Sequence, residues 1–290
     1  MAILVTGGTG QVGRALQRLA PDRVVAPKRA LLDLADPEAL AEMVASQEWE
    51  AVINCAAYTA VDKAEADVVA AWTVNALAPA AFAAATAKAG IPLVHLSTDY
   101  VFDGSKAEPY VEDDPVAPLG VYGASKEGGE QAVRTANPNH IILRTAWVVS
   151  ADGANFVKTM LRLAAGRPEL RVVGDQYGCP TSADDIARAC IAIVDRLAQP
   201  DAPRGTYHFV NAGEANWADL AEAVVARAAT HGRPRPIVTR ITTADYPTPA
   251  RRPANSRLST AKLARDFGIT APEWHVAVDA IVDTLLKDQA

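Results

Sequence analysis

The sequence predicts a doubly wound α/β fold of the Rossmann type, with a parallel sheet and a smaller C-terminal substrate-binding lobe. Two observations support this prediction. Short apolar runs alternate with amphipathic stretches through the first half of the chain, and a glycine-rich loop joins the first run to the first amphipathic stretch. Strands that alternate with helices of this length need crossover connections, which give parallel pairing.

Five apolar runs are the expected strands: AILVT at 2–6, RVVAP at 23–27, AVINCAA at 51–57, PLVHLST at 92–98 and HIILRTAW at 140–147. Helices are expected at 11–20, 36–45 and 78–90, and near 216–230, 259–267 and 273–288 in the proline-rich and arginine-rich last third. We expect residues 1–150 to form a dinucleotide-binding domain, to which 181–212 returns. Residues 151–180 and 213–290 would form the substrate-binding lobe.

The composition limits the partners of the chain. Its 290 residues carry 28 basic and 34 acidic side chains, a net charge of −6. Nucleic acids and anionic membranes require a basic surface, so we expect neither as a partner. We see no signal-peptide pattern at the N-terminus and expect no membrane-spanning run. Three cysteines without a C-x-x-C pair, Cys55, Cys179 and Cys190, indicate reduced thiols in a cytoplasmic protein.

The glycine loop is the strongest local motif. The first strand runs directly into Gly7-Gly8-Thr9-Gly10-Gln11-Val12-Gly13, and a helical pattern follows. Glycines permit a tight turn and let backbone N–H groups approach a pyrophosphate at the helix N-terminus, where the dipole favours negative charge. A strand before the loop and a helix after it are the context in which this motif binds a dinucleotide. A structural loop of the same shape is the alternative.

The end of the second strand is expected to set the cofactor preference. The acidic residue that would hold a ribose 2′-hydroxyl is missing there, and Lys28 and Arg29 stand in its place. Two cations suit a 2′-phosphate, which favours NADPH, with NADH as a second choice. Ordinary solvated loop charges are the alternative. Asp33 lies in a turn that could approach an adenine. The alternative is that Asp33 belongs to the start of the next helix.

Three side chains are expected at the carboxyl ends of strands, where ligands bind in an open α/β sheet. Thr98 ends the fourth strand, and Tyr122 and Lys126 share one face of the next helix, about 5 to 6 Å apart at Cβ. We expect the ammonium of Lys126 and an oxidised nicotinamide to lower the pKa of the Tyr122 phenol. Carbonyl reduction would use a hydride from the cofactor, a proton from Tyr122 and the Thr98 hydroxyl to polarise the oxygen, while Lys126 holds the ribose. A chance surface pair is the alternative.

Eight segments, in this order, resemble the extended short-chain dehydrogenase/reductase superfamily, and within it the dTDP-4-dehydrorhamnose reductase family. They are TGGTGQVG, NCAAYTAVDKAE, STDYVFDG, VYGASKEGGE, LRTAWVVS, NFVKTMLRLA, DQYGCPTSADDIA and RPANSRL. The resemblance implies NAD(P)H-dependent reduction of the 4-keto group of dTDP-4-dehydro-L-rhamnose. It also implies that Thr98, Tyr122 and Lys126 are the catalytic set.

The resemblance implies further site residues. The residues that would surround the pyrophosphate are Gly7, Gly10, Gln11, Val12 and Gly13. The residues that would lie alongside the cofactor are Ala56, Ala57 and Tyr58. The substrate would meet Val61, Thr98, Tyr100, Phe102, Trp147, Arg252 and Asn255. Arg252 suits a diphosphate because a guanidinium matches phosphate oxygens in pairs. A core position for Trp147 and a solvated loop position for Arg252 are the alternatives.

One departure from the family concerns metal binding. Members that dimerise through magnesium use a glutamate where this chain has Ala15, so we expect no metal and no magnesium-linked homodimer.

Two other functions fit the motifs. A nucleotide-sugar 4-epimerase shares the scaffold, whereas a dehydratase needs an acid and a base near Thr98, where Asp99 is the one acidic neighbour. A non-catalytic subunit resembling the regulatory subunit of methionine adenosyltransferase would keep the nucleotide site. The intact set of Thr98, Tyr122 and Lys126 favours turnover over that last function.

Overall fold

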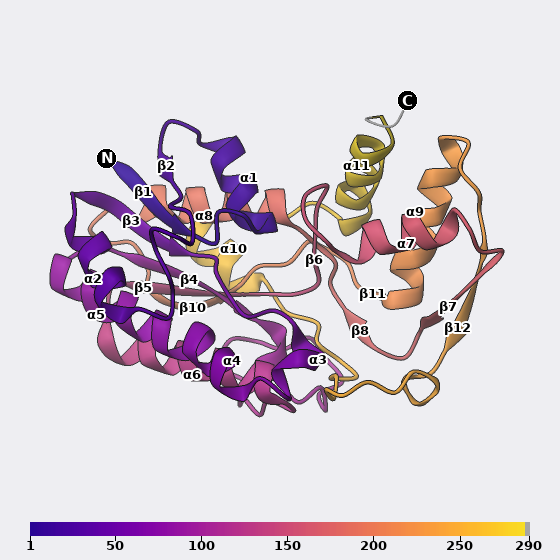
Figure 1. The fold of residues 1–290 in the computed structure, drawn as a ribbon, viewed down its shortest axis with the longest axis horizontal. Coiled ribbons are helices and arrows are strands. Elements are labelled where there is room, and N and C mark those ends of the chain that lie inside the picture. The colour runs from indigo at the N-terminus through magenta and orange to yellow at the C-terminus, as the bar shows by residue number, and fades with distance from the viewer. Residues whose placement is uncertain (288–290) are drawn as a thin grey trace.

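The structure, a computed structural model, describes residues 1–287 and has a six-stranded sheet at its centre (Figure 1). The strand order is β10-β5-β4-β3-β1-β2, and every pairing in this sheet is parallel. The strands are β1 (Ala2–Thr6), β2 (Val24–Val25), β3 (Trp49–Asn54), β4 (Leu93–Thr98), β5 (His140–Thr145) and β10 (Gly205–His208). The predicted doubly wound parallel sheet is confirmed.

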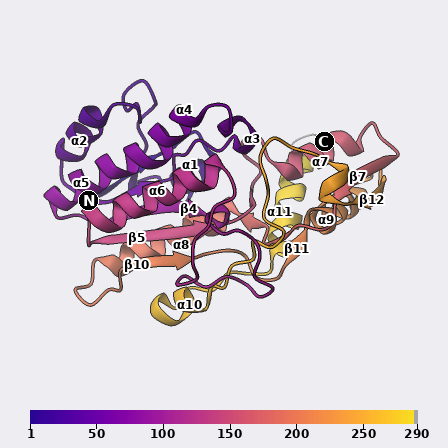
Figure 2. The same cartoon turned by 90° about the horizontal axis from the view of Figure 1, so that it is seen from below.

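Helices cover both faces of the sheet (Figure 2). One layer contains α1 (Gln11–Leu19), α8 (Ala183–Leu197) and α10 (Ala261–Phe267), and the other contains α2 (Pro37–Ala45), α5 (Ala78–Ala89) and α6 (Val121–Ala136). Side chains alternate along a strand. In β1, Ile3 and Val5 therefore pack with the first layer, and Leu4 packs with the second.

A long apolar helix belongs to the second layer. Segments α4 (Val68–Trp72), η1 (Thr73–Leu77, a π-helical turn) and α5 continue one another over Val68–Ala89. Its length and mean hydropathy of 1.6 would suffice to cross a membrane, so the expectation that no run meets this test is wrong. In this fold the helix packs against α2 and α6, and Phe82 and Ala83 lie fully buried in the core. That burial is a sufficient reason for its apolar composition.

A second core lies beside the sheet. It is formed by α7 (Phe156–Ala164), α9 (Trp217–Thr230), α11 (Trp274–Lys287) and the parallel pair of β7 (Glu169–Val173) and β12 (Ile237–Ile241). Two short pairs, β6 (Val148–Val149) with β9 (Thr181–Ser182) and β8 (Tyr177–Gly178) with β11 (Ala215–Asn216), lie between the two cores (Figure 1). The expected helices near 216–230, 259–267 and 273–288 are present as α9, α10 and α11.

The chain crosses between the two cores more than once. β10 pairs with β5 and α8 packs on α1, so parts of the range 181–212 lie at the central sheet. Leu263 of α10 also joins the sheet core, although the range 213–290 was assigned to the other lobe. The division into a dinucleotide-binding domain and a substrate-binding lobe stays a prediction.

Candidate active site

A cleft of about 900 Å³ runs along the carboxyl ends of the central strands. It is bounded by the loop after β1, the segments after β2 and β3, and helix α6. The residues predicted to bind the cofactor all line it: Gly7, Gly10, Gln11, Val12, Gly13, Lys28, Arg29, Asp33, Ala56, Ala57, Tyr58, Tyr122 and Lys126. Stretches that are far apart in the sequence thus face one space, although their contact with a cofactor stays a prediction.

The glycine loop is shaped by close backbone approach. Gly7 has a φ of +72°, and its carbonyl accepts a hydrogen bond of 2.9 Å from the Gly10 N–H. A Cβ at Gly13 would lie 2.2 Å from the Gly7 oxygen, and a Cβ at Gly7 would lie 2.9 Å from the Ala56 nitrogen. Helix α1 begins at Gln11 with no side-chain cap from Gly10. Its first N–H groups are therefore suited to an anion in the cleft.

The charged residues after β2 lie at the wall of this cleft. Lys28 and Arg29 are exposed, and the Arg29 Nε lies 3.9 Å from the Asp33 carboxylate. An ion pair this long between exposed side chains is weak, so it leaves Arg29 available to a phosphate. Asp33 also accepts a hydrogen bond of 3.0 Å from the Ala35 N–H. Asp33 thus shapes its turn and faces the cleft at the same time.

Thr98, Tyr122 and Lys126 meet at the end of β4. The Thr98 hydroxyl donates to the Asp99 carboxylate at 3.0 Å and accepts from the Tyr100 N–H at 3.2 Å. The Thr98 hydroxyl also influences the pKa of the Tyr122 phenol, so the two side chains lie close together. Lys126 is 2% exposed, and its Nζ donates to the Leu96 carbonyl at 2.6 Å. The three predicted catalytic side chains are therefore neighbours.

Their pKa values differ from the expectation. Burial raises the pKa of Tyr122 to about 12, and hydrogen bonding with Thr98 offsets part of the rise. The expected lowering of the Tyr122 pKa by Lys126 is absent because the Lys126 ammonium points to the Leu96 carbonyl. Burial lowers the pKa of Lys126 to about 8, against the charge of Glu130. At neutral pH the phenol keeps its proton, which is the form that can protonate a carbonyl oxygen.

A buried asparagine holds the catalytic helix in place. Asn75, in the π-helical turn η1, accepts from the Tyr58 N–H at 2.8 Å and donates to the Tyr58 carbonyl and the Ser125 hydroxyl, at 3.2 and 3.0 Å. A Cβ at Gly129 would lie 2.1 Å from the backbone carbonyl oxygen of Asn75, so α6 lies close to this turn. No local pattern in the sequence indicated Asn75, because its partners lie 17 and 50 residues away.

A buried ion pair lies one turn beyond Lys126. Arg144 of β5 donates twice to the Glu130 carboxylate, at 2.9 and 2.7 Å, and Ser97 donates to it at 2.6 Å. The side chains of Glu130 and Arg144 are 0% and 3% exposed. This cluster fastens α6 to β4 and β5. It was not predicted from the sequence, although Glu130 follows Lys126 at helical spacing.

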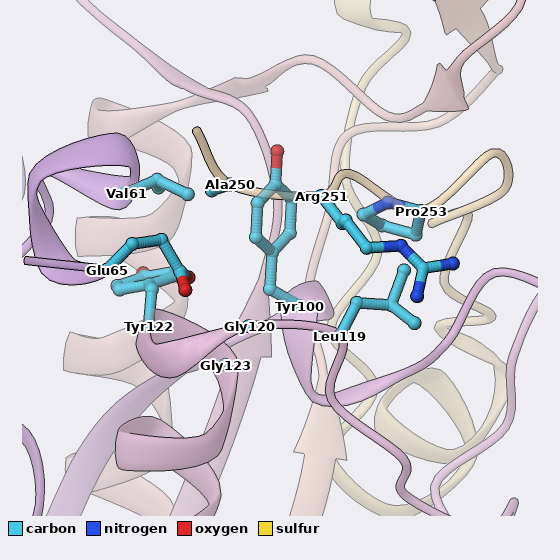
Figure 3. A pocket seen from close by; sticks show the side chains of 10 residues that line it. All are labelled: Val61, Glu65, Tyr100, Leu119, Gly120, Tyr122, Gly123, Ala250, Arg251 and Pro253. Carbon is cyan, nitrogen blue, oxygen red and sulfur yellow. The ribbon is translucent and has the colours of Figure 1, made fainter. Parts of the chain in front are cut away.

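A small hollow adjoins Tyr122 (Figure 3). Val61, Tyr100 and Arg251 line it, and the Tyr100 and Tyr122 rings meet edge to face with centroids 5.8 Å apart. Val61 and Tyr100 thus lie where substrate contacts were predicted. Arg251 was missed, and it projects from the loop on the other side of Tyr100 from Tyr122 (Figure 3).

Two predicted diphosphate contacts are engaged by the protein itself. The Arg252 guanidinium pairs with both oxygens of Asp62, at 3.1 and 2.9 Å. The amide of Asn255 donates to the carbonyls of Lys106 and Glu108, at 2.6 and 3.0 Å. Both side chains hold loops around the site. Their contact with substrate stays a prediction that these hydrogen bonds do not favour.

Two predicted aromatic contacts have different outcomes. Phe102 is 0% exposed and stacks on Tyr110 with ring centroids 4.1 Å apart, so the prediction that it faces substrate is wrong. Trp147 is half-buried and stacks on Trp217 at 3.6 Å. Among residues 1–287, Trp147 is the one non-glycine residue with a positive φ, at +46°. Such strain is concentrated at functional sites, which keeps Trp147 as a substrate candidate and adds Trp217.

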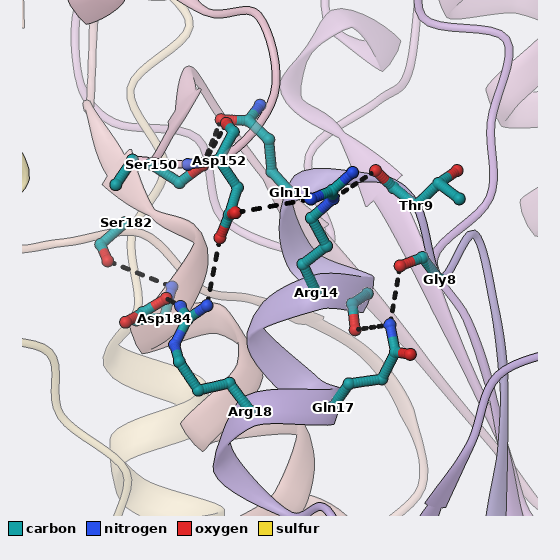
Figure 4. Close-up of polar contacts among 12 residues, drawn as sticks. Gly8, Thr9, Gln11, Arg14, Gln17, Arg18, Ser150, Asp152, Ser182 and Asp184 are labelled. Atoms are coloured by element: carbon teal, nitrogen blue, oxygen red, sulfur yellow. Dashed lines mark hydrogen bonds and ion pairs between the residues drawn. The ribbon is translucent and has the colours of Figure 1, made fainter. Parts of the chain in front are cut away.

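Polar contacts tie the glycine loop to the segment after β6 (Figure 4). The Gln11 side chain accepts from Ser150 at 2.9 Å and from Asn155 at 3.1 Å. Arg18 bridges Asp152 and Asp184 at 3.1 and 2.5 Å. The Gln11 side chain thus binds this segment, and the backbone N–H of Gln11 is left to bind a pyrophosphate.

A parallel sheet of this order, a glycine loop at the first strand-to-helix turn, and a tyrosine and lysine in the same cleft define an extended short-chain dehydrogenase/reductase. The sequence profile of the RmlD substrate-binding domain matches residues 1–287, and the chain belongs to this family.

Several similar proteins carry the name dTDP-4-dehydrorhamnose reductase. The dTDP-4-dehydrorhamnose reductase of Sinorhizobium fredii is 47% identical over 99% of both chains. A crystal structure of a dTDP-4-dehydrorhamnose reductase from Clostridium acetobutylicum has a TM-score of 0.92 at 38% identity, covering 98% of this chain and 99% of that one. The dTDP-4-dehydrorhamnose reductase of Bacillus anthracis in complex with NADP has a TM-score of 0.91 at 32% identity, covering 98% and 100%.

Proposed function

We propose that this chain is a cytoplasmic reductase that converts dTDP-4-dehydro-L-rhamnose to dTDP-L-rhamnose with NADPH, and with NADH as a second choice. The observation that supports this most is the single cleft in which Tyr122 and Lys126 face the glycine loop. The relatives named dTDP-4-dehydrorhamnose reductase supply the substrate, and the NADP complex of the Bacillus anthracis protein supports the cofactor.

The cleft fits the dinucleotide by its chemistry. Uncapped N–H groups of α1 would hold the pyrophosphate, Lys28 and Arg29 the 2′-phosphate, and Lys126 the nicotinamide ribose. When bound, the cofactor supplies the hydride for C4 of the sugar. Tyr122 gives its phenolic proton to the C4 oxygen, and Thr98 hydrogen-bonds to that oxygen. The phenolate that remains on Tyr122 then takes up a proton from solvent.

The decisive experiment follows NADPH absorbance with dTDP-4-dehydro-L-rhamnose generated in situ, beside a Tyr122→Phe control. The variant keeps the aromatic ring that packs on Tyr100 and loses only the proton donor. We expect turnover to fall at least about 100-fold with NADPH affinity unchanged. Full turnover by the variant would contradict the role of the phenol. Tight NADPH binding without turnover by the natural protein would favour another keto-sugar or the regulatory-subunit alternative.

We also infer that a homodimer of this chain would form without magnesium. Ala15 is 0% exposed and lies in the core between α1 and the sheet, so the position offers no metal ligand. Sedimentation of the protein with and without a chelator tests this, and dissociation by the chelator would contradict it.

A further inference from the structure

The carboxyl group of Asp99 lies beside the catalytic threonine and has no role in the mechanism above. Asp99 is the first residue of the 3-10 turn η2 (Asp99–Val101), which follows β4 directly, and the residue is 2% exposed. One oxygen, Oδ1, accepts the hydrogen of the Thr98 hydroxyl at 3.0 Å. The other, Oδ2, is buried and has no hydrogen-bond partner among residues 1–287. A buried carboxyl oxygen without a partner is rare in native proteins and calls for an explanation.

The Thr98 hydroxyl has a limited capacity for hydrogen bonds, namely one hydrogen and two acceptor lone pairs. The Tyr100 N–H occupies one lone pair at 3.2 Å. While Asp99 is ionised, its carboxylate takes the one hydrogen, and Thr98 can then only accept from a further group. A substrate carbonyl oxygen needs a donor. In this state Thr98 therefore cannot polarise the keto group.

We propose that Asp99 is a positioning residue that decides whether Thr98 donates its hydrogen to the keto oxygen of the substrate. When the Asp99 carboxyl carries a proton, it donates to the Thr98 oxygen, and the threonine hydrogen turns to the substrate. Asp99 exchanges this proton with solvent, and the proton that enters the product still comes from Tyr122. The inference rests on the proposed function, because that function places the keto oxygen at Thr98.

The surroundings of Asp99 raise its pKa toward neutral pH. Burial raises the pKa of Asp99 to about 6, and the hydroxyls of Ser256 and Thr98 offset part of the rise. Ser256 itself directs its hydrogen to the Tyr177 carbonyl at 3.4 Å. The titratable groups that face Asp99 are Tyr100, Tyr122 and Cys179. The cations in this region are Arg252, which lowers the pKa of Tyr100, and Arg257, which lowers the pKa of Cys179. Burial raises the pKa of all three titratable groups, so they stay neutral at pH 7, and neither cation pairs with Asp99.

The test compares the pH dependence of kcat between pH 5 and pH 7.5, below the pKa of about 8 for Lys126, at saturating NADPH and keto-sugar. It uses the natural protein, Asp99→Asn, Thr98→Val and the double variant. In the natural protein we expect kcat to fall as Asp99 ionises, by up to about 100-fold, which is the usual effect of losing one donor to a reacting carbonyl oxygen. The amide introduced by Asp99→Asn donates to Thr98 at every pH. That variant should keep the low-pH rate throughout the range.

Thr98→Val serves as the matched control. It should be slow at every pH, and Asp99→Asn should change nothing further in that background, because Asp99 acts through Thr98. A persisting fall in kcat above pH 6 in Asp99→Asn would overturn the proposal. A purely structural role for Asp99 would lower kcat in Asp99→Asn without removing the pH dependence.

A second measurement tests the inference even if the Asp99→Asn variant does not fold. It also distinguishes failure of this inference from failure of the proposed function. Infrared difference spectra of the protonated carboxyl report the pKa of Asp99 in the natural protein and in Thr98→Val. Loss of the threonine removes a charge-assisted hydrogen bond to the carboxylate and a weaker one from the protonated acid, so the pKa of Asp99 should rise. An unchanged pKa would overturn the inference. Absence of turnover by the natural protein at every pH would instead refute the proposed function, and the infrared titration would still decide whether Asp99 and Thr98 are coupled.

Discussion

Replacing Arg144 by methionine would leave the Glu130 carboxylate buried beside Lys126 without its main partner. Arg144 supplies two of the hydrogen bonds to this carboxylate, and the Glu130 side chain is 0% exposed. Removing one member of such a pair usually lowers the free energy of unfolding by about 3 to 5 kcal/mol. Arg134 still donates to Glu130 at 2.9 Å, so we expect about 3 kcal/mol.

The cause can be separated from simple loss of packing. Glu130→Gln combined with Arg144→Met removes both charges and keeps an acceptor for Ser97, so we expect it to recover most of the loss. Urea unfolding of the natural protein, of Arg144→Met and Glu130→Gln alone, and of the double variant gives the coupling energy. A loss below about 1 kcal/mol in Arg144→Met, or no recovery in the double variant, would refute this reasoning.

The pH dependence supplies an independent check on the same pair. Burial tends to raise the pKa of Glu130, but the hydrogen bonds and charge of Arg144 hold it below its ordinary value. A lowered pKa in the folded state adds stability above the ordinary pKa of a glutamate, and this stability is lost as the pH falls through the folded value. Without Arg144 burial dominates, and the pH dependence should reverse. Unfolding of Arg144→Met at pH 5 and pH 8 tests the sign.

Three further predictions concern single positions. Gly13→Val would force a Cβ to within 2.2 Å of the Gly7 oxygen, so NADPH binding measured by fluorescence should be lost, and unchanged affinity would contradict the role of the loop. Phe102→Ala should cost about 3 to 5 kcal/mol in urea unfolding because the ring is fully buried, whereas a substrate contact would change mainly KM. Lys28→Ala and Arg29→Ala should each weaken NADPH more than NADH in kinetic assays, and an unchanged cofactor preference would remove them from the 2′-phosphate site.

The parts of the site that the sequence predicted depend on local geometry. A glycine loop between a strand and a helix, a threonine at a strand end, and a tyrosine and lysine four residues apart each fix their own backbone. Parallel strands then bring their carboxyl ends together. For this reason the proximity of Thr98, Tyr122 and Lys126 could be predicted from sequence patterns alone.

The parts that it missed depend on distant partners or on a change of local conformation. Arg252 pairs with Asp62 across 190 residues, and nothing in RPANSRL indicates that its charge is already used. Tyr100 and Phe102 would share one face of an extended strand, but residues 99–101 form a 3-10 turn. The turn directs Phe102 into the core while Tyr100 stays beside Tyr122. Spacing alone therefore could not distinguish the buried ring of Phe102 from the Tyr100 ring beside Tyr122.

The error about the pKa of Tyr122 bears on the direction of the reaction. Helical spacing fixes the Cβ atoms of Tyr122 and Lys126, but the flexible lysine stem carries its Nζ to the Leu96 carbonyl. With a pKa raised to about 12, the phenol keeps its proton at neutral pH. Oxidation of an alcohol needs the phenolate as base, whereas reduction of a ketone needs the phenol as acid. The protein environment of Tyr122 thus favours reduction, and loss of a protonated Asp99 at higher pH would oppose it.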